Sequence, residues 1–132
     1  MVKYLFSLII STVLLLHCSD DILAPAYQYD SSVNGKTVSA SHNQQFILEL
    51  DLAADAGYQW DLSISDSFVV KIDSTCKRPK SGKWNIDGGM TIETFYFKAL
   101  KRGKCSVNIK EYQNWEPDVE PINKVQFDVI VR

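Results

Sequence analysis

The sequence predicts an all-β protein: an immunoglobulin-like antiparallel β-sandwich of about seven to eight strands. Short runs of alternating apolar and polar residues recur at spacings of about 8–12 residues, with turn signals between them. No segment keeps a helical period over about twelve residues. The chain has 132 residues, 45% of them hydrophobic and 23% charged, which is the composition of one globular domain rather than of a disordered chain.

Alternation locates each expected strand, because successive side chains of a strand point to opposite faces. The clearest case is the run in which Phe46, Leu48, Leu50 and Leu52 share one face. The segment 73–86 is polar and is expected to be a connection with at most an irregular strand near Trp84. The expected strands are an edge strand at 37–40 and further strands at 46–52, 58–64, 68–72, 93–99, 105–110 and 125–131.

The segment 87–117 is the most informative part of the chain. Its two strands, 93–99 and 105–110, are separated by a polar turn that contains Gly103, which predicts a β-hairpin. A hairpin brings its outer ends together, so the loops at 87–89 and 113–115 are expected at one end of the domain. The loop at 53–57 joins two other strands and can lie at the same end.

The N-terminus predicts a targeting segment that is not part of the fold. Residues 1–17 combine one positive charge with an apolar core too short for a membrane span, as in a signal peptide. The run ending in Cys18 resembles a bacterial lipobox, which predicts lipidation of Cys18; ordinary cleavage after residues 24–26 is the alternative. We therefore expect a tether and edge strand at 18–43 and the folded domain at 44–132.

Apart from Cys18, the sequence has two cysteines. In an oxidising compartment Cys76 and Cys105 are expected to form a disulfide, and the alternative is two free thiols that act as small hydrophobic residues.

The sequence offers little for other function classes. A net charge of −2 argues against nucleic acid and against an anionic membrane surface as partners. The run of Glu111, Glu116, Asp118 and Glu120 lacks the spacing of a calcium loop, so we expect a solvated face and no metal. No G-x-S-x-G motif is present and His42 lies in a polar stretch, so we expect no enzymatic activity and no cofactor.

Three loop motifs, in chain order, resemble those of the chagasin-type inhibitors of papain-like cysteine proteases. That family carries an N-P-T-T-G loop before a Tyr-x-Trp strand, a G-x-G-G loop before an aromatic strand, and an R-P-W loop. Here the corresponding segments are Ala-Ala-Asp-Ala-Gly before Tyr-Gln-Trp at 53–60, Ile-Asp-Gly-Gly at 86–89 before the aromatic strand 95–100, and Tyr-Gln-Asn-Trp at 112–115. The glycines and the Trp are kept, while the other tip residues differ.

The resemblance implies a reversible inhibitor that plugs the protease cleft with three loops and presents no cleavable bond. It implies that the first loop covers the catalytic centre, that the Gly-rich loop lines the non-primed wall, and that the Trp packs on the primed side. The implied protease-binding residues are Asp55, Ala56, Gly57, Tyr58, Gly88, Gly89, Asn114 and Trp115. The Asp55 carboxylate would face a thiolate–imidazolium pair, so we expect weaker or differently selective binding than with Thr.

The expected protein is thus a monomeric, exported inhibitor whose only membrane contact is a lipid anchor. We expect it at the outer membrane, at the cell surface or in the periplasm. The alternative is a structural or adhesive immunoglobulin-like module that has lost the inhibitory tips.

Overall fold

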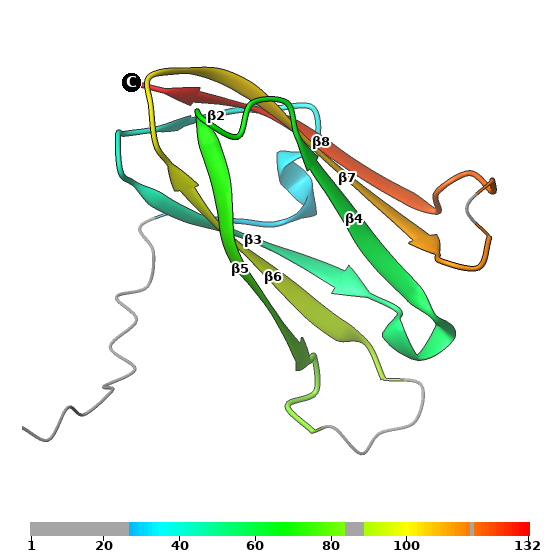
Figure 1. Ribbon diagram of the computed structural model, residues 1–132. Coiled ribbons are helices and arrows are strands. Elements are labelled where there is room, and N and C mark those ends of the chain that lie inside the picture. Colours follow the sequence, from blue (N-terminus) through cyan, green and yellow to red (C-terminus); the bar gives the residue numbers. More distant parts are fainter. Residues whose placement is uncertain (1–26, 84–88, 117) are drawn as a thin grey trace, which may run out of the picture.

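Two four-stranded sheets pack face to face in the computed structural model, which describes residues 27–83, 89–116 and 118–132 (Figure 1). The strand order is β1-β3-β6-β5 in one sheet, called sheet A, and β2-β8-β7-β4 in the other, called sheet B. The elements are β1 Gln28–Tyr29, the 3₁₀ turn η1 Ser31–Val33, β2 Thr37–Ala40, β3 Gln45–Leu52, the 3₁₀ turn η2 Ala54–Ala56, β4 Tyr58–Ile64, β5 Val70–Pro79, β6 Thr91–Ala99, β7 Gly103–Gln113 and β8 Asn123–Val131.

The predicted all-β sandwich is confirmed, with one difference in strand direction. Pairs within β3 to β8 are antiparallel, but β1 runs parallel to β3 and β2 runs parallel to β8. Both sheets are therefore mixed, and each carries its parallel strand at one edge.

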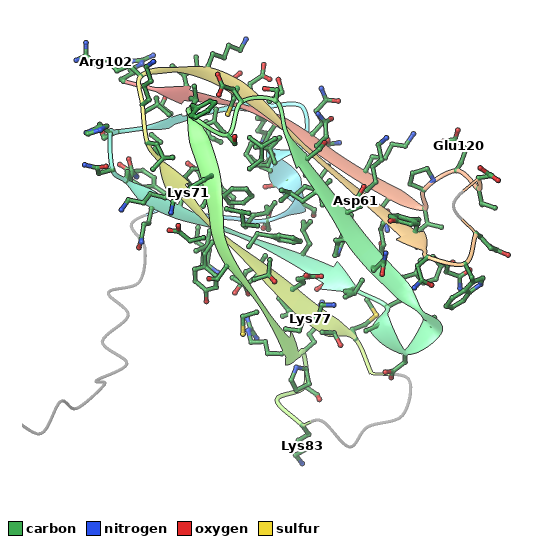
Figure 2. All side chains as sticks on the ribbon, viewed as in Figure 1. Asp61, Lys71, Lys77, Lys83, Arg102 and Glu120 are labelled. Atoms are coloured by element: carbon green, nitrogen blue, oxygen red, sulfur yellow. The ribbon has the colours of Figure 1, made fainter. Side chains whose placement is uncertain are left out.

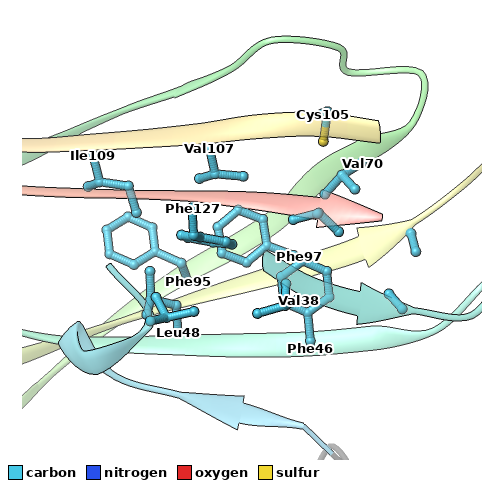
Figure 3. Packing of buried hydrophobic residues seen from close by; sticks show 14 of the residues in the cluster. Val38, Phe46, Leu48, Val70, Phe95, Phe97, Cys105, Val107, Ile109 and Phe127 are labelled. Atoms are coloured by element: carbon cyan, nitrogen blue, oxygen red, sulfur yellow. The ribbon is translucent and has the colours of Figure 1, made fainter. Parts of the chain in front are cut away.

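The core lies between the sheets and is built from the apolar positions of the alternating strands (Figure 3). Phe46 and Phe97 stack with their ring centroids 5.0 Å apart, and Phe127 of sheet B meets Phe97 edge-on at 6.3 Å. All three rings are at most 2% exposed. Because Phe46 and Phe97 come from sheet A and Phe127 comes from sheet B, this cluster joins the two sheets. Aromatic pairs of this kind stabilise the core beyond the burial of their apolar area.

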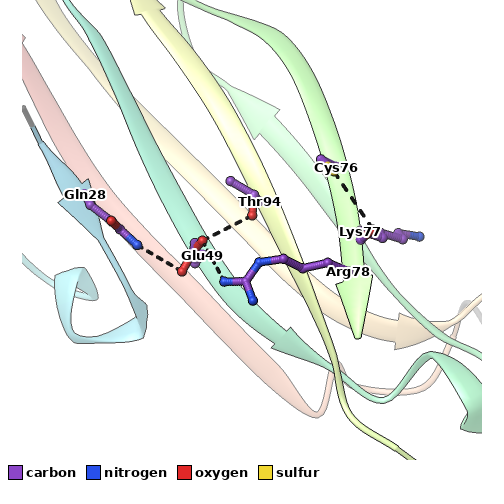
Figure 4. Close-up of polar contacts among 6 residues, drawn as sticks. All are labelled: Gln28, Glu49, Cys76, Lys77, Arg78 and Thr94. Carbon is purple, nitrogen blue, oxygen red and sulfur yellow. Dashed lines mark hydrogen bonds and ion pairs between the residues drawn. The ribbon is translucent and has the colours of Figure 1, made fainter. Parts of the chain in front are cut away.

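The outer face of sheet A is tied together by Glu49 (Figure 4). Its carboxylate accepts hydrogen bonds from Gln28 of β1 at 3.0 Å and from Arg78 of β5 at 3.1 Å. The hydroxyl of Thr94 on β6 lies 3.5 Å away. One side chain thus links all four strands of this sheet.

The predicted hairpin of β6 and β7 is wrong, because the two strands belong to different sheets. The connection at 100–102 carries the chain from one layer of the sandwich to the other. A polar turn with a glycine fits both a hairpin and a crossing between layers, and alternation does not distinguish them. The observed hairpin partners are β5 with β6 and β7 with β8.

The strand expected at 68–72 is shifted and longer. Phe68 is 80% exposed, and Val69 and Val70 occupy the buried positions instead. A turn shifts the register: the amide of Phe68 donates to the Asp66 side chain and the amide of Val69 donates to the Asp66 carbonyl. β5 then continues to Pro79 as an edge strand, so the polar sequence that predicted a connection is mostly an exposed strand. The irregular strand expected near Trp84 lies outside the described residues.

The folded body begins earlier than residue 44. The edge strand expected at 37–40 is present as β2, and Val33, Val38 and Ala40 are buried in the core. Any tether must therefore end before β1. The proposed signal at 1–17 and Cys18 lie outside the described residues.

The predicted disulfide is contradicted, since both Cys76 and Cys105 are free thiols. Cys76 is exposed on sheet A, paired in register with Thr94 on the outer face. Cys105 is 2% exposed and points into the core from sheet B. Cys76 faces solvent and Cys105 faces the core, so the backbone would have to be rebuilt to join them. Cys105 instead serves as a small core residue, and burial raises the pKa of its thiol.

The chain enters the body at the pole opposite to the β3–β4 loop. Gln28 and Tyr29 pair with Ile47 and Leu48, near the start of β3, whereas β3 ends at Leu52. The C-terminal end of β8 lies at this same opposite pole (Figure 1). Within the described residues no helix has the length and hydropathy needed to span a membrane.

Candidate functional site

Three loops gather at the pole that lies away from the chain entry (Figure 1). The first loop, residues 53–57, joins β3 to β4; the second, 80–90, joins β5 to β6; the third, 114–122, joins β7 to β8. The registers place them together: Thr91 is paired with both Leu52 and Pro79 in sheet A, and Gln113 is paired with Tyr58 in sheet B.

The first loop is a single 3₁₀ turn that ends at Gly57. The amide of Gly57 donates to the Ala54 carbonyl at 2.9 Å, and no side chain caps the start of the turn. Gly57 has φ +80°, a left-handed conformation that side chains with a Cβ disfavour. The tip residue Asp55 is exposed, and Ala56 and Gly57 follow it directly.

The indole of Trp115, in the third loop, lies directly over Gly57. A Cβ added at Gly57 would overlap the ring atoms Cη2 and Cζ3 of Trp115 and would approach Cζ2 to 3.1 Å. The Trp residue nevertheless remains 62% exposed. The outer part of the six-membered ring is thus packed on Gly57 while most of the residue is open to solvent, so the first and third loops form one continuous surface.

Two polar side chains of β7 also reach the first loop. The Nε2 of Gln113 donates to the Ala56 carbonyl at 2.8 Å. Glu111 is only 3% exposed; its Oε2 accepts from the Asn123 side chain at 2.6 Å and its Oε1 lies 3.5 Å from the Ala53 amide. The predicted solvated acidic face is therefore wrong for Glu111, although Glu116, Asp118 and Glu120 are exposed.

The second loop borders the first across a shallow pocket. This pocket of about 200 Å³ is lined by Ala54 and Asp55 on one side and by Lys83, Gly89 and Met90 on the other. Figure 2 shows the Lys83 side chain projecting at this end of the molecule. Gly88 lies outside the described residues, so only Gly89 of the predicted glycine pair is placed, next to the first loop.

A buried carboxylate lies below the second loop. Glu93 on β6 is 6% exposed, and its Oε2, 3.9 Å from Lys77 Nζ, has no hydrogen-bond partner among the described residues. Burial raises the pKa of the Glu93 carboxyl, and the Lys77 ammonium offsets part of that rise. Burial therefore makes the charged form of Glu93 less favourable in the folded protein than in the unfolded chain.

The structure brings together most of the residues that the sequence analysis singled out. Asp55, Ala56, Gly57 and Gly89 lie around the first loop, Trp115 covers Gly57, and Asn114 is exposed beside it. Tyr58 is half-buried at the start of β4. Sequence reasoning missed the roles of Glu111 and Gln113, although both continue the alternating row of β7 that points inward.

The ridge is defined here as the first loop together with Trp115 and the second-loop residues Lys83, Gly89 and Met90 that line the shared pocket. Among the described residues no three His, Cys, Asp or Glu side chains gather as metal ligands. An exposed indole on a loop of a β-sandwich is typical of a protein-binding surface, because Trp is enriched among the residues that carry binding energy.

Comparison with known proteins identifies the family. Residues 39–131 match the family described as chagasin family peptidase inhibitor I42, and the chain therefore belongs to that family. The members of this family are peptidase inhibitors and not enzymes, and this protein is likewise a peptidase inhibitor and not an enzyme. Comparison with curated protein sequences gives no significant match.

Solved structures share the fold. The cysteine protease inhibitor EhICP2 from Entamoeba histolytica superposes with a TM-score of 0.72 at 18% identity, covering 80% of this chain and 95% of that one. Amebosin gives 0.67 at 13% identity, covering 80% and 98%. PbICP-C, solved in complex with falcipain-2, gives 0.60 at 18% identity, covering 80% and 99%.

Proposed function

We propose that the protein inhibits papain-like cysteine proteases reversibly, by filling their active-site cleft with the ridge. The observation that carries the proposal is the packing of the Trp115 indole on Gly57, which makes one protruding surface from two loops distant in sequence. Family membership and the complex of PbICP-C with falcipain-2 support a protease as the partner.

Each loop has a distinct role in this proposal. Residues 55–58 cover the catalytic centre with backbone and short side chains. Gly88 and Gly89 line the non-primed wall, where the absence of side chains lets the backbone come close. Asn114 and Trp115 hold the primed side, where the exposed part of the indole supplies apolar contact area.

The shape of the first loop explains why such an inhibitor would stay intact. A peptide substrate lies extended along a protease cleft, whereas residues 54–56 form a 3₁₀ turn closed by a left-handed glycine. The carbonyl of Ala56 is already bonded to Gln113. The nucleophile would therefore meet a folded turn instead of an extended bond.

The test is a titration of papain and a cathepsin L-like protease with the purified domain and with Trp115→Ala. We expect tight, non-covalent inhibition that weakens about 30-fold or more in the variant, as for a central aromatic contact. Phe68→Ala is the matched control, because Phe68 is 80% exposed and lies before β5 at the opposite pole. No inhibition at high micromolar concentration would refute the proposal and favour the adhesive module.

We also propose that the chain is exported, anchored by a lipid on Cys18, and active as a monomer. The support is the sequence: an apolar segment in 4–16 is followed, after His17, by Cys18. Labelled fatty acid should enter the wild-type protein and not Cys18→Ser. Equal labelling of both would contradict the anchor.

A further inference from the structure

The first loop has little structure of its own to hold its shape. Its residues are Ala53, Ala54, Asp55, Ala56 and Gly57, so only one side chain has hydrogen-bonding groups. Its internal bonds are those of one short 3₁₀ turn, a geometry of limited stability without outside support. A loop that must enter a cleft in one shape therefore needs contacts from outside itself.

Those contacts come from a single row of side chains. Cys105, Val107 and Ile109 point into the core from alternate positions of β7 and are at most 2% exposed. The same alternation continues through Glu111 and Gln113, and Trp115 follows two residues after the strand. The row leaves the core at Glu111 and then runs beneath the first loop.

Each of the last members of the row meets a successive part of that loop. Glu111 lies at its start, at the Ala53 amide, and Trp115 covers its end, at Gly57. Between them, Gln113 donates to the Ala56 carbonyl at 2.8 Å, the best-formed hydrogen bond from outside the loop. The first loop is thus held at Ala53, Ala56 and Gly57 by residues of β7 and of the segment just after it.

We propose that Gln113 is a positioning residue, whose hydrogen bond to Ala56 sets the first loop in its plugging shape before the protease arrives. This inference rests on the proposed function. Its physical basis is that ordering a loop in advance removes an entropic cost from binding. Gln113 acts through the loop and does not itself need to touch the protease.

Two variants separate the possible roles. Gln113→Ala removes the side chain, and Gln113→Glu keeps its size but replaces the N–H donor with a carboxylate. Gln126→Ala is the control, because Gln126 is an exposed glutamine on β8. Inhibition constants, thermal stability, and amide hydrogen exchange of Gly57 and Tyr58 in the free protein are measured for each.

We expect both variants to raise the inhibition constant about fivefold at pH 7, the equivalent of one ordinary hydrogen bond. The amides of Gly57 and Tyr58, which bond within the loop, should exchange faster in the free variants, while the melting temperature stays near that of the wild type. As the pH falls toward 4, the Glu variant regains an O–H donor, so its deficit relative to wild type should shrink. The loss of inhibition in Gln113→Ala relative to wild type should not change over the same pH range.

The outcomes distinguish the two levels of the argument. Unchanged loop exchange in both variants would overturn the positioning role; weaker inhibition with unchanged exchange would show that Gln113 contacts the protease directly. If the wild type inhibits no protease, the proposed function fails, yet the exchange data on the free protein still decide whether Gln113 orders the loop.

Discussion

Gly57→Ala is the substitution for which the structure gives the most direct expectation. The new Cβ would sit at φ +80°, which costs an L-residue about 1–2 kcal/mol. It would also overlap the Trp115 ring, so the indole must leave its place. Because an exposed loop residue can move, the ring is expected to swing away from the first loop.

The second cost follows from the burial of the indole. Trp115 is 62% exposed, so nearly two-fifths of a residue that offers roughly 250 Å² is covered. At about 25 cal/mol per Å², losing that cover costs up to about 2 kcal/mol, which is an upper bound. Together with the backbone term, Gly57→Ala should lower the free energy of unfolding by about 2–4 kcal/mol.

Gly35→Ala is a matched control that measures only the free-energy cost of placing a side chain at a positive φ. Gly35 has φ +74°, and nothing lies within 4 Å of a Cβ placed there. We therefore expect about 1–2 kcal/mol for Gly35→Ala. Urea denaturation measures both losses, and inhibition of papain should weaken only in Gly57→Ala.

A double-mutant cycle tests the reasoning further. In a Trp115→Ala background no ring remains to be displaced, so Gly57→Ala should cost only as much as Gly35→Ala. If Gly57→Ala costs the same in both backgrounds, the indole does not rest on Gly57 in solution, and the joined ridge is wrong.

Three other measurements test separate features. Glu93→Gln should be more stable than wild type at pH 7. The raised pKa of Glu93 means that its carboxyl binds a proton more tightly in the folded than in the unfolded state. The stability of the wild type should therefore fall as the pH rises from about 4.5 through the raised pKa, and that of the Gln variant should not. Parallel stability curves for the two proteins over that range would contradict this. A thiol reagent followed by peptide mapping should label Cys76 in the folded protein and Cys105 only after unfolding, and protection of Cys76 under non-reducing conditions would revive the disulfide. Replacing Asp55 and Ala56 by Thr should tighten papain inhibition, and no gain with any papain-like protease would remove the electrostatic argument against Asp55.

Alternation predicted best the strands that bury one face and expose the other. The strand expected at 58–64 is β4 with the same bounds, and those expected at 46–52 and 125–131 differ from β3 and β8 by one or two residues at one end. The second half of β5 was missed because it is an edge strand with solvent on most sides. Its sequence has no apolar period, so only pairing with β6 reveals it.

The convergence of the loops was predicted correctly, although by a partly wrong route. The expected hairpin of β6 and β7 does not exist, yet strands that alternate in direction between two layers bring every second connection to the same pole. What sequence could not supply was the contact of the Trp115 ring with Gly57 and the hydrogen bond from Gln113 to Ala56. Such contacts depend on the position of the end of β7 relative to the loop between β3 and β4. No pattern of residues along the chain gives the distance between these two segments.

The parallel pairing of β1 with the early part of β3 has a practical consequence. Whatever is attached ahead of Tyr27, whether an affinity tag, a biosensor surface or a second inhibitor, joins the body at the pole remote from Trp115. Immobilisation through the N-terminal side should leave the loops as accessible as they are in free solution, and a tandem fusion of two copies should present both ridges without mutual obstruction.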